Sequence, residues 1–283
     1  MIRAAIIGAS GYSGEELVRL LLDHPRVALR AVTSRAKAGV ALGRVFPRFA
    51  DHPAARKLAF LRPELAEVFA ALGSEKKRAV AFLALPHGVA AEWAVPLLEA
   101  GFRVVDLSAD FRLRSAAAYK EFYGHAHPAP ELLKEAVYGL PELRGAEVRR
   151  ARLVASPGCY PTSILVPLVP LLRANLLKPN RLVINSLSGV SGAGRKLEES
   201  GLFCECHESL RAYGVPKHRH LSEIEQELTL AARQKVVVQF TPHLVPVNRG
   251  ILTSVAAEPT KPAAEIAARI EAAWARAYAR APF

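Results

Sequence analysis

One cysteine stands where nucleophilic chemistry is most plausible. Cys159 lies in Ser156-Pro157-Gly158-Cys159-Tyr160-Pro161-Thr162, between a short apolar strand pattern and an apolar helix pattern. The partial positive charge of a helix N-terminus favours a thiolate, which is the form that attacks acyl groups at neutral pH. Most cysteines of intracellular proteins are buried and inert, so position alone leaves a structural role for Cys159 open.

Groups able to move protons follow later in the chain. The tripeptide 218–220 is His-Arg-His, just before a predicted helix. An imidazole changes charge near neutral pH, so His220 is a candidate acid/base partner for Cys159 if the fold brings them together. Glu223 has the helical spacing to orient that ring. A surface loop is the alternative for both histidines.

A glycine-rich turn near the N-terminus has the placement of a nucleotide-binding loop. Gly8, Gly11 and Gly14 have G-x-x-G-x-x-G spacing where the first strand meets the first helix. Glycines there let backbone amides close on a pyrophosphate at the helix N-terminus. A tight connection without a ligand is the alternative. The candidate cofactor residues of this turn are Gly8, Ser10, Gly11, Tyr12, Ser13 and Gly14.

The end of the second strand favours NADP over NAD. NAD-specific folds usually carry an acidic residue there for the ribose 2′-hydroxyl. This chain has Thr33-Ser34-Arg35 and no acidic residue as far as Gly39. An arginine suits a 2′-phosphate, although Arg35 is also readable as a solvated surface residue.

Two other polar segments are possible ligand sites. Residues 188–195, which run from Ser188 to Arg195, offer amides, hydroxyls and a guanidinium for an anion, or form a flexible turn. Residues 204–207, Cys-Glu-Cys-His, offer at most three metal ligands in poor chelating geometry, so no metal site is expected.

The first half of the chain has the pattern of a doubly wound sheet. Continuous apolar strands alternate with helical patterns, as parallel strands buried on both faces require. The predicted strands are residues 4–8, 27–32, 79–85 and 103–106, and the predicted helices are residues 15–23 and 90–99. We therefore predict an α/β, Rossmann-type NADP-binding domain over residues 1–150.

The second half has a different pattern, which predicts an α+β catalytic and oligomerisation domain over residues 151–283 with a largely antiparallel sheet. Its predicted elements are strands 153–155, 182–187, 236–247 and 251–257 and a helix over 162–172. The turn 248–250 is expected to join the last two strands as an antiparallel hairpin. Ser222 and Glu225 have capping-box spacing for a further helix.

Composition excludes several classes of protein. The 283 residues are 51% hydrophobic, which is enough for two cores and excludes a disordered chain. Lys and Arg exceed Asp and Glu by 38 to 26, which indicates an anionic partner, but the basic runs are too short for nucleic acid. No apolar run reaches the roughly 18 residues of a membrane span. Three cysteines and no signal-peptide pattern predict a cytoplasmic protein.

Five segments, in this order, resemble those of the N-acetyl-gamma-glutamyl-phosphate reductase family, and the resemblance covers the whole chain. The Ser-Pro-Gly-Cys and Ser-Ala-Asp-Phe-Arg segments are specific to that family and its close relatives. The five segments are residues 8–14, Leu85-Pro86-His87-Gly88, Asp106-Leu107-Ser108-Ala109-Asp110-Phe111-Arg112, Tyr138-Gly139-Leu140-Pro141-Glu142 and residues 156–162.

The resemblance implies roles for the candidate residues. It makes Cys159 the nucleophile, His220 the acid/base catalyst and His218 a neighbour of the cofactor. It implies that the glycine-rich turn holds the phosphates of NADP(H), and that Ser34 and Arg35 meet the 2′-phosphate. It also implies a homo-oligomer, either a dimer or a tetramer. Candidates for contact with the substrate are Arg112, Ser188, Arg195, Arg219 and Glu223.

The same resemblance implies a reaction. N-acetyl-gamma-glutamyl phosphate would be reduced to N-acetyl-glutamate 5-semialdehyde and phosphate through a cysteine thioester, in arginine biosynthesis. A related reductase of aspartyl phosphate or of a carrier-bound aminoadipyl phosphate is one alternative. Chains of the family continue past the position of Phe283 with a segment that returns to the NADP-binding domain. A non-catalytic NADP-binding fragment is therefore the other alternative.

Overall fold

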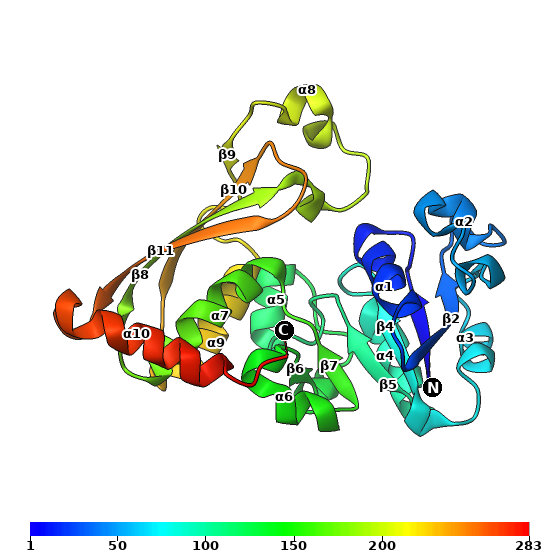
Figure 1. Ribbon diagram of the computed structural model, residues 1–283, viewed down its shortest axis with the longest axis horizontal. Coiled ribbons are helices and arrows are strands. Elements are labelled where there is room, and N and C mark those ends of the chain that lie inside the picture. The colour runs from blue at the N-terminus through cyan, green and yellow to red at the C-terminus, as the bar shows by residue number, and fades with distance from the viewer. Residues whose placement is uncertain (283) are drawn as a thin grey trace. The chain divides into compact units, whose positions relative to one another are not determined.

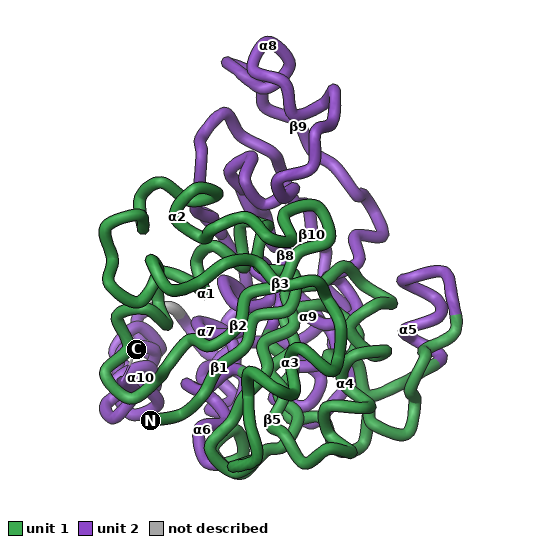
Figure 2. Tube along the Cα trace, turned by 90° about the vertical axis from the view of Figure 1, so that its right-hand side faces the viewer, with its two compact units in different colours: residues 1–116, 126–139, 147–156 green, residues 117–125, 140–146, 157–283 purple. Residues whose placement is uncertain are grey.

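The computed structural model describes residues 1–282, and the chain divides into two compact units (Figure 2). The first unit comprises residues 1–116, 126–139 and 147–156, and the second comprises residues 117–125, 140–146 and 157 onward. Two short segments, residues 117–125 and 140–146, therefore belong to the second unit although residues of the first unit follow them in the chain.

A seven-stranded sheet forms the centre of the first unit, in the order β3-β2-β1-β4-β5-β7-β6 (Figure 1). Every pairing between neighbouring strands is parallel, which confirms the predicted Rossmann-type sheet. The strands are β1 (Ile2–Ile7), β2 (Val27–Thr33), β3 (Phe60–Leu61), β4 (Ala79–Leu83), β5 (Arg103–Asp106), β6 (Val137–Tyr138) and β7 (Leu153–Ala155).

Both faces of this sheet are buried, which explains why its strands are continuous apolar runs. On β1, Ala4 and Ile6 pack into one core cluster with Val18 of α1, while Ala5 and Ile7 pack into the other with Leu97 of α4. The helices of this unit are α1 (Tyr12–Leu22), α2 (Leu42–Val45), α3 (Leu65–Leu72) and α4 (Ala90–Glu99), and α6 (Pro141–Arg150) ends in it.

The strand Leu153–Ala155 belongs to the first unit, so its predicted place in the second domain is wrong. As β7 it pairs with β5, through Val104 and Leu153, and with β6. A three-residue apolar strand carries no pattern that states which sheet it joins, and pairing with β5 was decided by the tertiary fold.

A four-stranded mixed sheet lies in the second unit, in the order β11-β8-β10-β9. Its strands are β8 (Leu177–Gly189), β9 (Arg211–Ala212), β10 (Val238–Val245) and β11 (Ile251–Pro259). β8 pairs with β11 antiparallel and with β10 parallel, and β9 pairs with β10 antiparallel. Two of the three pairings are therefore antiparallel, as the predicted fold class requires.

The predicted hairpin between the last two strands is wrong, because β8 lies between them. The turn 248–250 crosses the end of β8 instead of closing a two-stranded ladder. The amides of Gly189, Val190 and Ser191 donate to the carbonyls of Gly250, Val247 and Asn248, at 3.0, 2.9 and 3.1 Å. These bonds attach residues 247–250 to the end of β8, which pairs with both β10 and β11.

Helix α7 is the central helix of the second unit and packs against α9, α10, β8 and β11. Pro170 has no amide to donate to the carbonyl of Val166, and the hydroxyl of Tyr278 donates to that carbonyl instead. Trp274 Nε1 donates to the carbonyl of Pro167 at 2.9 Å. The helices of this unit are α5 (Ala116–Tyr123), α7 (Cys159–Arg173), α8 (Phe203–Cys206), α9 (His220–Ala232) and α10 (Ala263–Tyr278).

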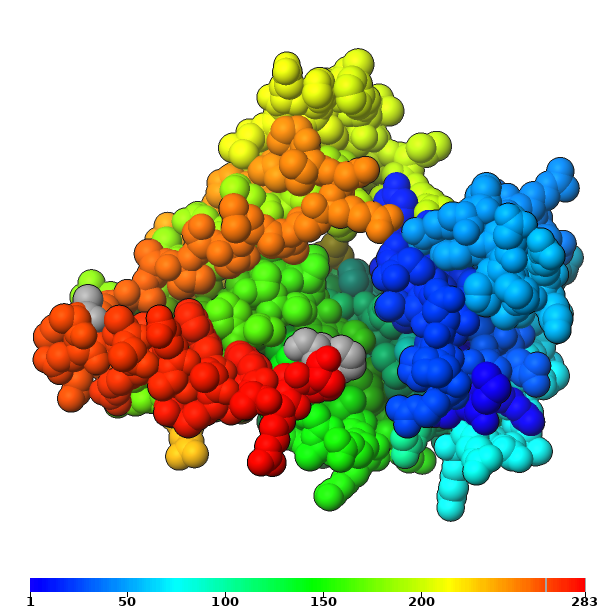
Figure 3. Space-filling view, viewed as in Figure 1, coloured from blue at the N-terminus to red at the C-terminus, as the bar shows by residue number. Residues whose placement is uncertain are grey.

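Helix α10 runs along the surface of the second unit, where it is drawn in red (Figure 3). Among residues 1–282, no helix is both long enough and apolar enough to cross a bilayer.

Candidate active site

The glycine-rich turn of the first unit is built so closely that two of its glycines cannot carry a side chain. Gly8 has a φ of +84°, and a β-carbon there would lie 2.5 Å from the carbonyl oxygen of Ala84. A β-carbon on Gly14 would lie 2.5 Å from Cα of Ala9. Gly11 is the N-cap of α1 and has no side chain to occupy the amides of the first helical turn. The turn therefore lets a ligand approach its backbone amides closely, as phosphate binding requires.

Hydroxyl groups join this turn to the end of β2. Thr33 Oγ1 accepts the amide of Gly8 at 3.2 Å, and the carbonyl of Thr33 accepts the amide of Ala9 at 2.9 Å. The hydroxyls of Ser10 and Ser34 lie 3.0 Å apart. Arg35 follows on the exposed surface. The structure thus brings together Ser10 and Ser34, which the sequence separates by a whole helix.

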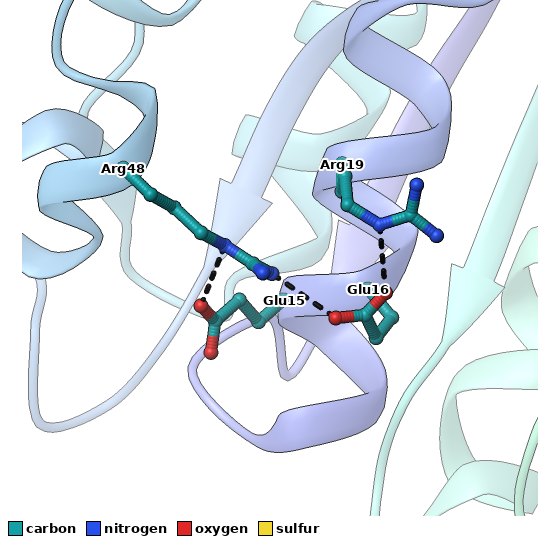
Figure 4. A network of polar contacts seen from close by, with 4 residues as sticks. All are labelled: Glu15, Glu16, Arg19 and Arg48. Atoms are coloured by element: carbon teal, nitrogen blue, oxygen red, sulfur yellow. Dashed lines mark hydrogen bonds and ion pairs between the residues drawn. The ribbon is translucent and has the colours of Figure 1, made fainter.

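Carboxylates at the start of α1 are paired with two arginines (Figure 4). Arg48 Nε lies 2.9 Å from Glu15 Oε1, and its Nη2 lies 3.1 Å from Glu16 Oε1. Arg19 Nε lies 2.8 Å from Glu16 Oε2. This network attaches the 3₁₀ turn Pro47–Phe49 to the first turn of α1 and compensates two negative charges next to the glycine-rich turn.

The segment after β5 forms a buried polar network. Asp106 accepts the amide and the hydroxyl of Ser108 at 2.9 and 2.8 Å. Burial raises the pKa of Asp106 to about 7, despite those hydrogen bonds. Asp110 accepts the amides of Gly88 and Ala91 at 2.7 and 3.2 Å, where its charge stabilises the N-terminus of α4.

Arg112 belongs to the same network. Its Nε donates to the carbonyl of Ser156 at 2.7 Å, and its Nη2 donates to the carbonyl of Leu107 at 2.9 Å. The amide of Ser156 donates to the carbonyl of Asp106 at 2.7 Å. Both backbone groups of Ser156, which stands three residues before Cys159, are thereby held. Arg112 is only 7% exposed, and its contact with the substrate stays a prediction.

In the second unit, Cys159 is the first residue of α7, and its side chain is exposed. Gly158 is the N-cap of that helix. Its carbonyl accepts the amide and the hydroxyl of Thr162, at 3.0 and 2.9 Å. Its amide donates to Glu223 Oε1 at 2.9 Å, a bond from α9. The backbone in front of the cysteine is therefore fixed on both sides.

His220 lies directly against this glycine. A β-carbon on Gly158 would lie 2.6 Å from His220 Nε2 and 2.8 Å from its Cε1. The ring also packs edge-on against Tyr160, with centroids 5.9 Å apart. The structure thus brings the His220 imidazole next to the backbone that carries Cys159, although the sequence separates them widely.

His218 sits in an aromatic cluster beside His220. Its ring contacts Tyr160, Tyr213 and Phe240, with centroids 5.4, 5.5 and 5.7 Å away. Its Nδ1 accepts the amide of His220 at 3.1 Å. Burial, together with the charge of Arg219, lowers the pKa of His218 to about 4, so this ring is neutral near pH 7.

The predicted capping box is wrong, because α9 begins at His220 and not after Ser222. Ser222 Oγ donates to the carbonyl of Arg219 at 2.9 Å, and Glu225 Oε1 accepts the amide of Val238 at 3.0 Å. The imidazole of His218 accepts the first amide of the helix, whereas a capping hydroxyl accepts the amide of the second or third helical residue.

Comparison with known proteins identifies the chain. The family model "Semialdehyde dehydrogenase, NAD binding domain" matches residues 3–151, and "Semialdehyde dehydrogenase, dimerisation domain" matches residues 159–283. The chain is 56% identical to an N-acetyl-gamma-glutamyl-phosphate reductase of Akkermansia muciniphila, over 100% of this chain and 79% of that one. A reductase of the same name from Pseudomonas putida (strain W619) is 46% identical, over 100% and 78%. The chain belongs to the N-acetyl-gamma-glutamyl-phosphate reductases of the semialdehyde dehydrogenase family.

Solved structures share the fold at low identity. Aspartate semialdehyde dehydrogenase II from Vibrio cholerae has a TM-score of 0.67 and 18% identity, covering 96% of this chain and 78% of that one. The enzyme from Candida albicans, solved with NADP, has a TM-score of 0.68 and 15% identity, covering 96% and 75%. The resemblance to the reductase family that the five sequence segments carry is confirmed, and so is the predicted fold class.

The remaining candidates are spread over the second unit. Ser188 is 4% exposed on β8, and its hydroxyl donates to the carbonyl of Gly189 at 3.1 Å. Arg195 follows the 3₁₀ turn Val190–Ala193 and is exposed, as is Arg219, whose guanidinium carbon lies 5.9 Å from the ring centroid of Tyr123. The assignment of these residues to the substrate stays a prediction for this member of the reductase family.

Sequence reasoning missed three contributions to the site. It gave no role to Asp106, to Tyr213, whose hydroxyl lies 2.7 Å from that of Tyr160, or to the Glu223–Gly158 bond. Asp106 stands within a segment that the family resemblance singled out, so that segment was the available signal. For the other two, the partners lie far apart in the chain, and no local spacing reports them.

Proposed function

We propose that this enzyme uses NADPH to reduce N-acetyl-gamma-glutamyl phosphate to N-acetyl-glutamate 5-semialdehyde, with release of phosphate, in arginine biosynthesis. Membership of the reductase family supports the substrate. One observation in the structure supports the mechanism best. Cys159 is exposed and is the first residue of α7, and the ring of His220 packs against Gly158, the residue before it.

The chemistry that we assign to Cys159 is acyl transfer. Its thiolate attacks the acyl carbonyl, the carbon–oxygen bond to phosphate breaks, and a thioester forms. After reduction of that thioester to a hemithioacetal, the carbon–sulfur bond breaks and the aldehyde leaves. The thioester makes the step feasible, because it is a far better hydride acceptor than a carboxylate. The helix N-terminus at Cys159 supports the thiolate that begins and ends this cycle.

His220 is the proton carrier of this proposal. It accepts the thiol proton before attack. It also accepts the hydroxyl proton when the hemithioacetal breaks down to the aldehyde and the thiolate. The other histidine is less suited, because Nδ1 of His218 already accepts a backbone amide, and a pKa of about 4 keeps the ring neutral. We retain His218 as a neighbour of the cofactor.

The first unit fits a dinucleotide. The turn from Gly8 to Gly14 is a cradle that β-carbons would fill, and Gly11 leaves the first amides of α1 without a capping side chain. Ser10, Tyr12 and Ser13 line the same turn. Ser34 and Arg35 at the end of β2 would hold the 2′-phosphate and select NADP over NAD. When bound, the cofactor supplies the hydride.

The remaining assignments belong to the same proposal. Arg112, Ser188, Arg195 and Arg219 are the candidates for contact with the substrate. The first unit, which includes most of residues 1–150, serves as the NADP-binding domain, and the second, which includes most of residues 151–283, serves as the catalytic and oligomerisation domain of a cytoplasmic enzyme. A homo-oligomer is supported by the dimerisation-domain match and by the exposed face of β11, where Leu252 is 65% exposed and pairs with Leu187 of β8. Sedimentation velocity tests this state.

The experiment runs the reaction in reverse. Purified protein is given N-acetyl-glutamate 5-semialdehyde, phosphate and NADP⁺, and NADPH is followed at its absorbance maximum. We expect phosphate-dependent turnover that Cys159→Ser abolishes and that Cys204→Ser leaves intact. Equal turnover of Cys159→Ser and the wild type would refute the mechanism. Faster turnover of aspartate semialdehyde would refute the substrate.

A further inference from the structure

Three side chains contact Gly158, and two of them come from α9. Thr162 holds its carbonyl from within α7. From α9, the ring of His220 covers its Cα, and Glu223 Oε1 accepts its amide at 2.9 Å. His220 and Glu223 stand three residues apart, a spacing that places both side chains on the same face of the helix.

The bond from Glu223 replaces one that α7 cannot make for itself. In a capping box, the third residue of a helix sends a carboxylate back to the amide of its N-cap. In α7 that third residue is Pro161, which has no such side chain. Glu223 supplies the carboxylate from another helix instead, and it does so in a buried setting, at 1% exposure.

We propose that Glu223 is a positioning residue, which fixes the amide of Gly158 so that Cys159 stays aligned with His220. This inference rests on the proposed function of those two residues. It assigns the carboxylate to the backbone in place of the substrate contact expected from the sequence. A charged acceptor makes a stronger hydrogen bond to an amide than a neutral one does. The carboxylate therefore holds the start of α7 in one position relative to α9.

The role predicts which kinetic parameter changes. Loss of the acceptor lets the first turn of α7 shift relative to His220, so the chemical steps slow. Misplacement of a reacting group by about 1 Å costs on the order of 10²-fold in rate. Binding of the substrate should change little, because Glu223 is 1% exposed and does not face solvent. We therefore expect a loss in kcat with KM within about threefold of the wild type.

The test compares Glu223→Ala with a matched control, Glu225→Ala. Glu225 stands on the same helix and also accepts one backbone amide, that of Val238 at 3.0 Å, but away from Cys159. Both variants should lower the melting temperature. Glu223→Ala should lower kcat about 10²-fold and slow alkylation of Cys159 by iodoacetamide, whereas Glu225→Ala should leave both rates near the wild type. Cys204→Ser and Cys206→Ser are included so that only one thiol reacts.

Two conservative variants test separately the charge of the acceptor and the length of its side chain. They also test the proposal if Glu223→Ala does not fold. Glu223→Gln keeps an acceptor oxygen at the same reach and should retain kcat within about fivefold, while Glu223→Asp keeps the charge but is one methylene too short and should be slower. The inference is overturned if Glu223→Asp is at least as fast as Glu223→Gln. Equal kcat in the two alanine variants overturns it as well. If the wild type shows no phosphate-dependent turnover, the proposed function fails, while the alkylation rates still test Glu223.

Discussion

The imidazole of His220 lies against the Cα of Gly158, so closely that a β-carbon there would come within 2.6 Å of Nε2. The absence of a side chain at residue 158 is thus what lets α9 bring its first residue up to the start of α7. This contact ties the position of the proposed proton carrier to the backbone that holds the proposed nucleophile.

Gly158→Ala should therefore impair catalysis much more than folding. The added methyl group must push the His220 ring away, which misaligns it with Cys159 and should lower kcat about 10²-fold. Gly145→Ala is the matched control, because a β-carbon at Gly145 would meet nothing within 4 Å. Steady-state kinetics and melting temperatures of both variants check this. Unchanged kcat in Gly158→Ala would mean that the ring position is not critical.

The two histidines should respond differently to substitution when activity is followed against pH. The pKa of His218 is held at about 4, below the assay range, so this ring contributes no ionisation between pH 6 and 9. Hence His218→Gln should lower the rate without altering the shape of the kcat/KM profile, whereas His220→Gln should remove one limb of it. A profile that changes shape in His218→Gln alone would reverse the assignment.

Asp106 should make stability depend on pH in an unusual direction. Its pKa is raised from the ordinary 3.8 to about 7, so the folded protein retains a proton that the unfolded chain releases between these values. The resulting stabilisation is complete below pH 3.8 and is lost as the pH rises through 7. Asp106→Asn cannot ionise.

The stability of Asp106→Asn relative to the wild type should therefore increase from pH 5 to pH 8, by at most a few kcal/mol, since one pKa unit corresponds to about 1.4 kcal/mol. Urea denaturation at several pH values measures this difference. Asp51→Asn, at an exposed carboxylate, serves as the control and should show no such trend. A constant difference between Asp106→Asn and the wild type across that range would show that Asp106 is already ionised in the folded protein.

Local patterns were enough to predict the strands β1, β2, β4 and β5 of the first unit, but not its strands β3 and β6, the place of β7 in that unit, or all of the second unit. Residues 4–7 of β1 are apolar and buried on both faces of the sheet, and such a continuous apolar run predicts a parallel sheet from sequence alone. The place of β8 between β10 and β11 depends on long-range pairing that the turn 248–250 does not encode. The start of α9 was missed because His218, and not a hydroxyl residue, accepts the amide of His220.

The candidate site divides in the same way. Cys159 and the glycine-rich turn can be recognised from the sequence, because each lies at a strand-to-helix junction formed by consecutive residues. The bond between Glu223 and Gly158 crosses 65 positions of sequence and has no local spacing to report it. What the sequence could not provide is the packing of α7 on α9, since that packing decides which side chains meet the glycine.

Arg48 should influence cofactor affinity through charge alone. It pairs with Glu15 in the first turn of α1 and with Glu16 next to it, and negative charge that Arg48 no longer compensates would repel the phosphates that the turn is proposed to bind. Arg48→Gln should raise the Kd of NADP⁺ about threefold to fivefold, since partly exposed ion pairs have modest energies, and the effect should shrink at high salt.

Isothermal titration calorimetry at two salt concentrations measures the change, and a second substitution isolates its cause. Adding Glu15→Gln to Arg48→Gln removes the carboxylate that Arg48 Nε contacts and should restore most of the affinity. Arg56→Gln is the control, because Arg56 pairs with the exposed Asp51 in the same unit, 3.0 Å away, and should leave the Kd unchanged. If the double variant binds no better than Arg48→Gln, Arg48 acts by holding the 3₁₀ turn Pro47–Phe49 on α1 and not by compensating charge.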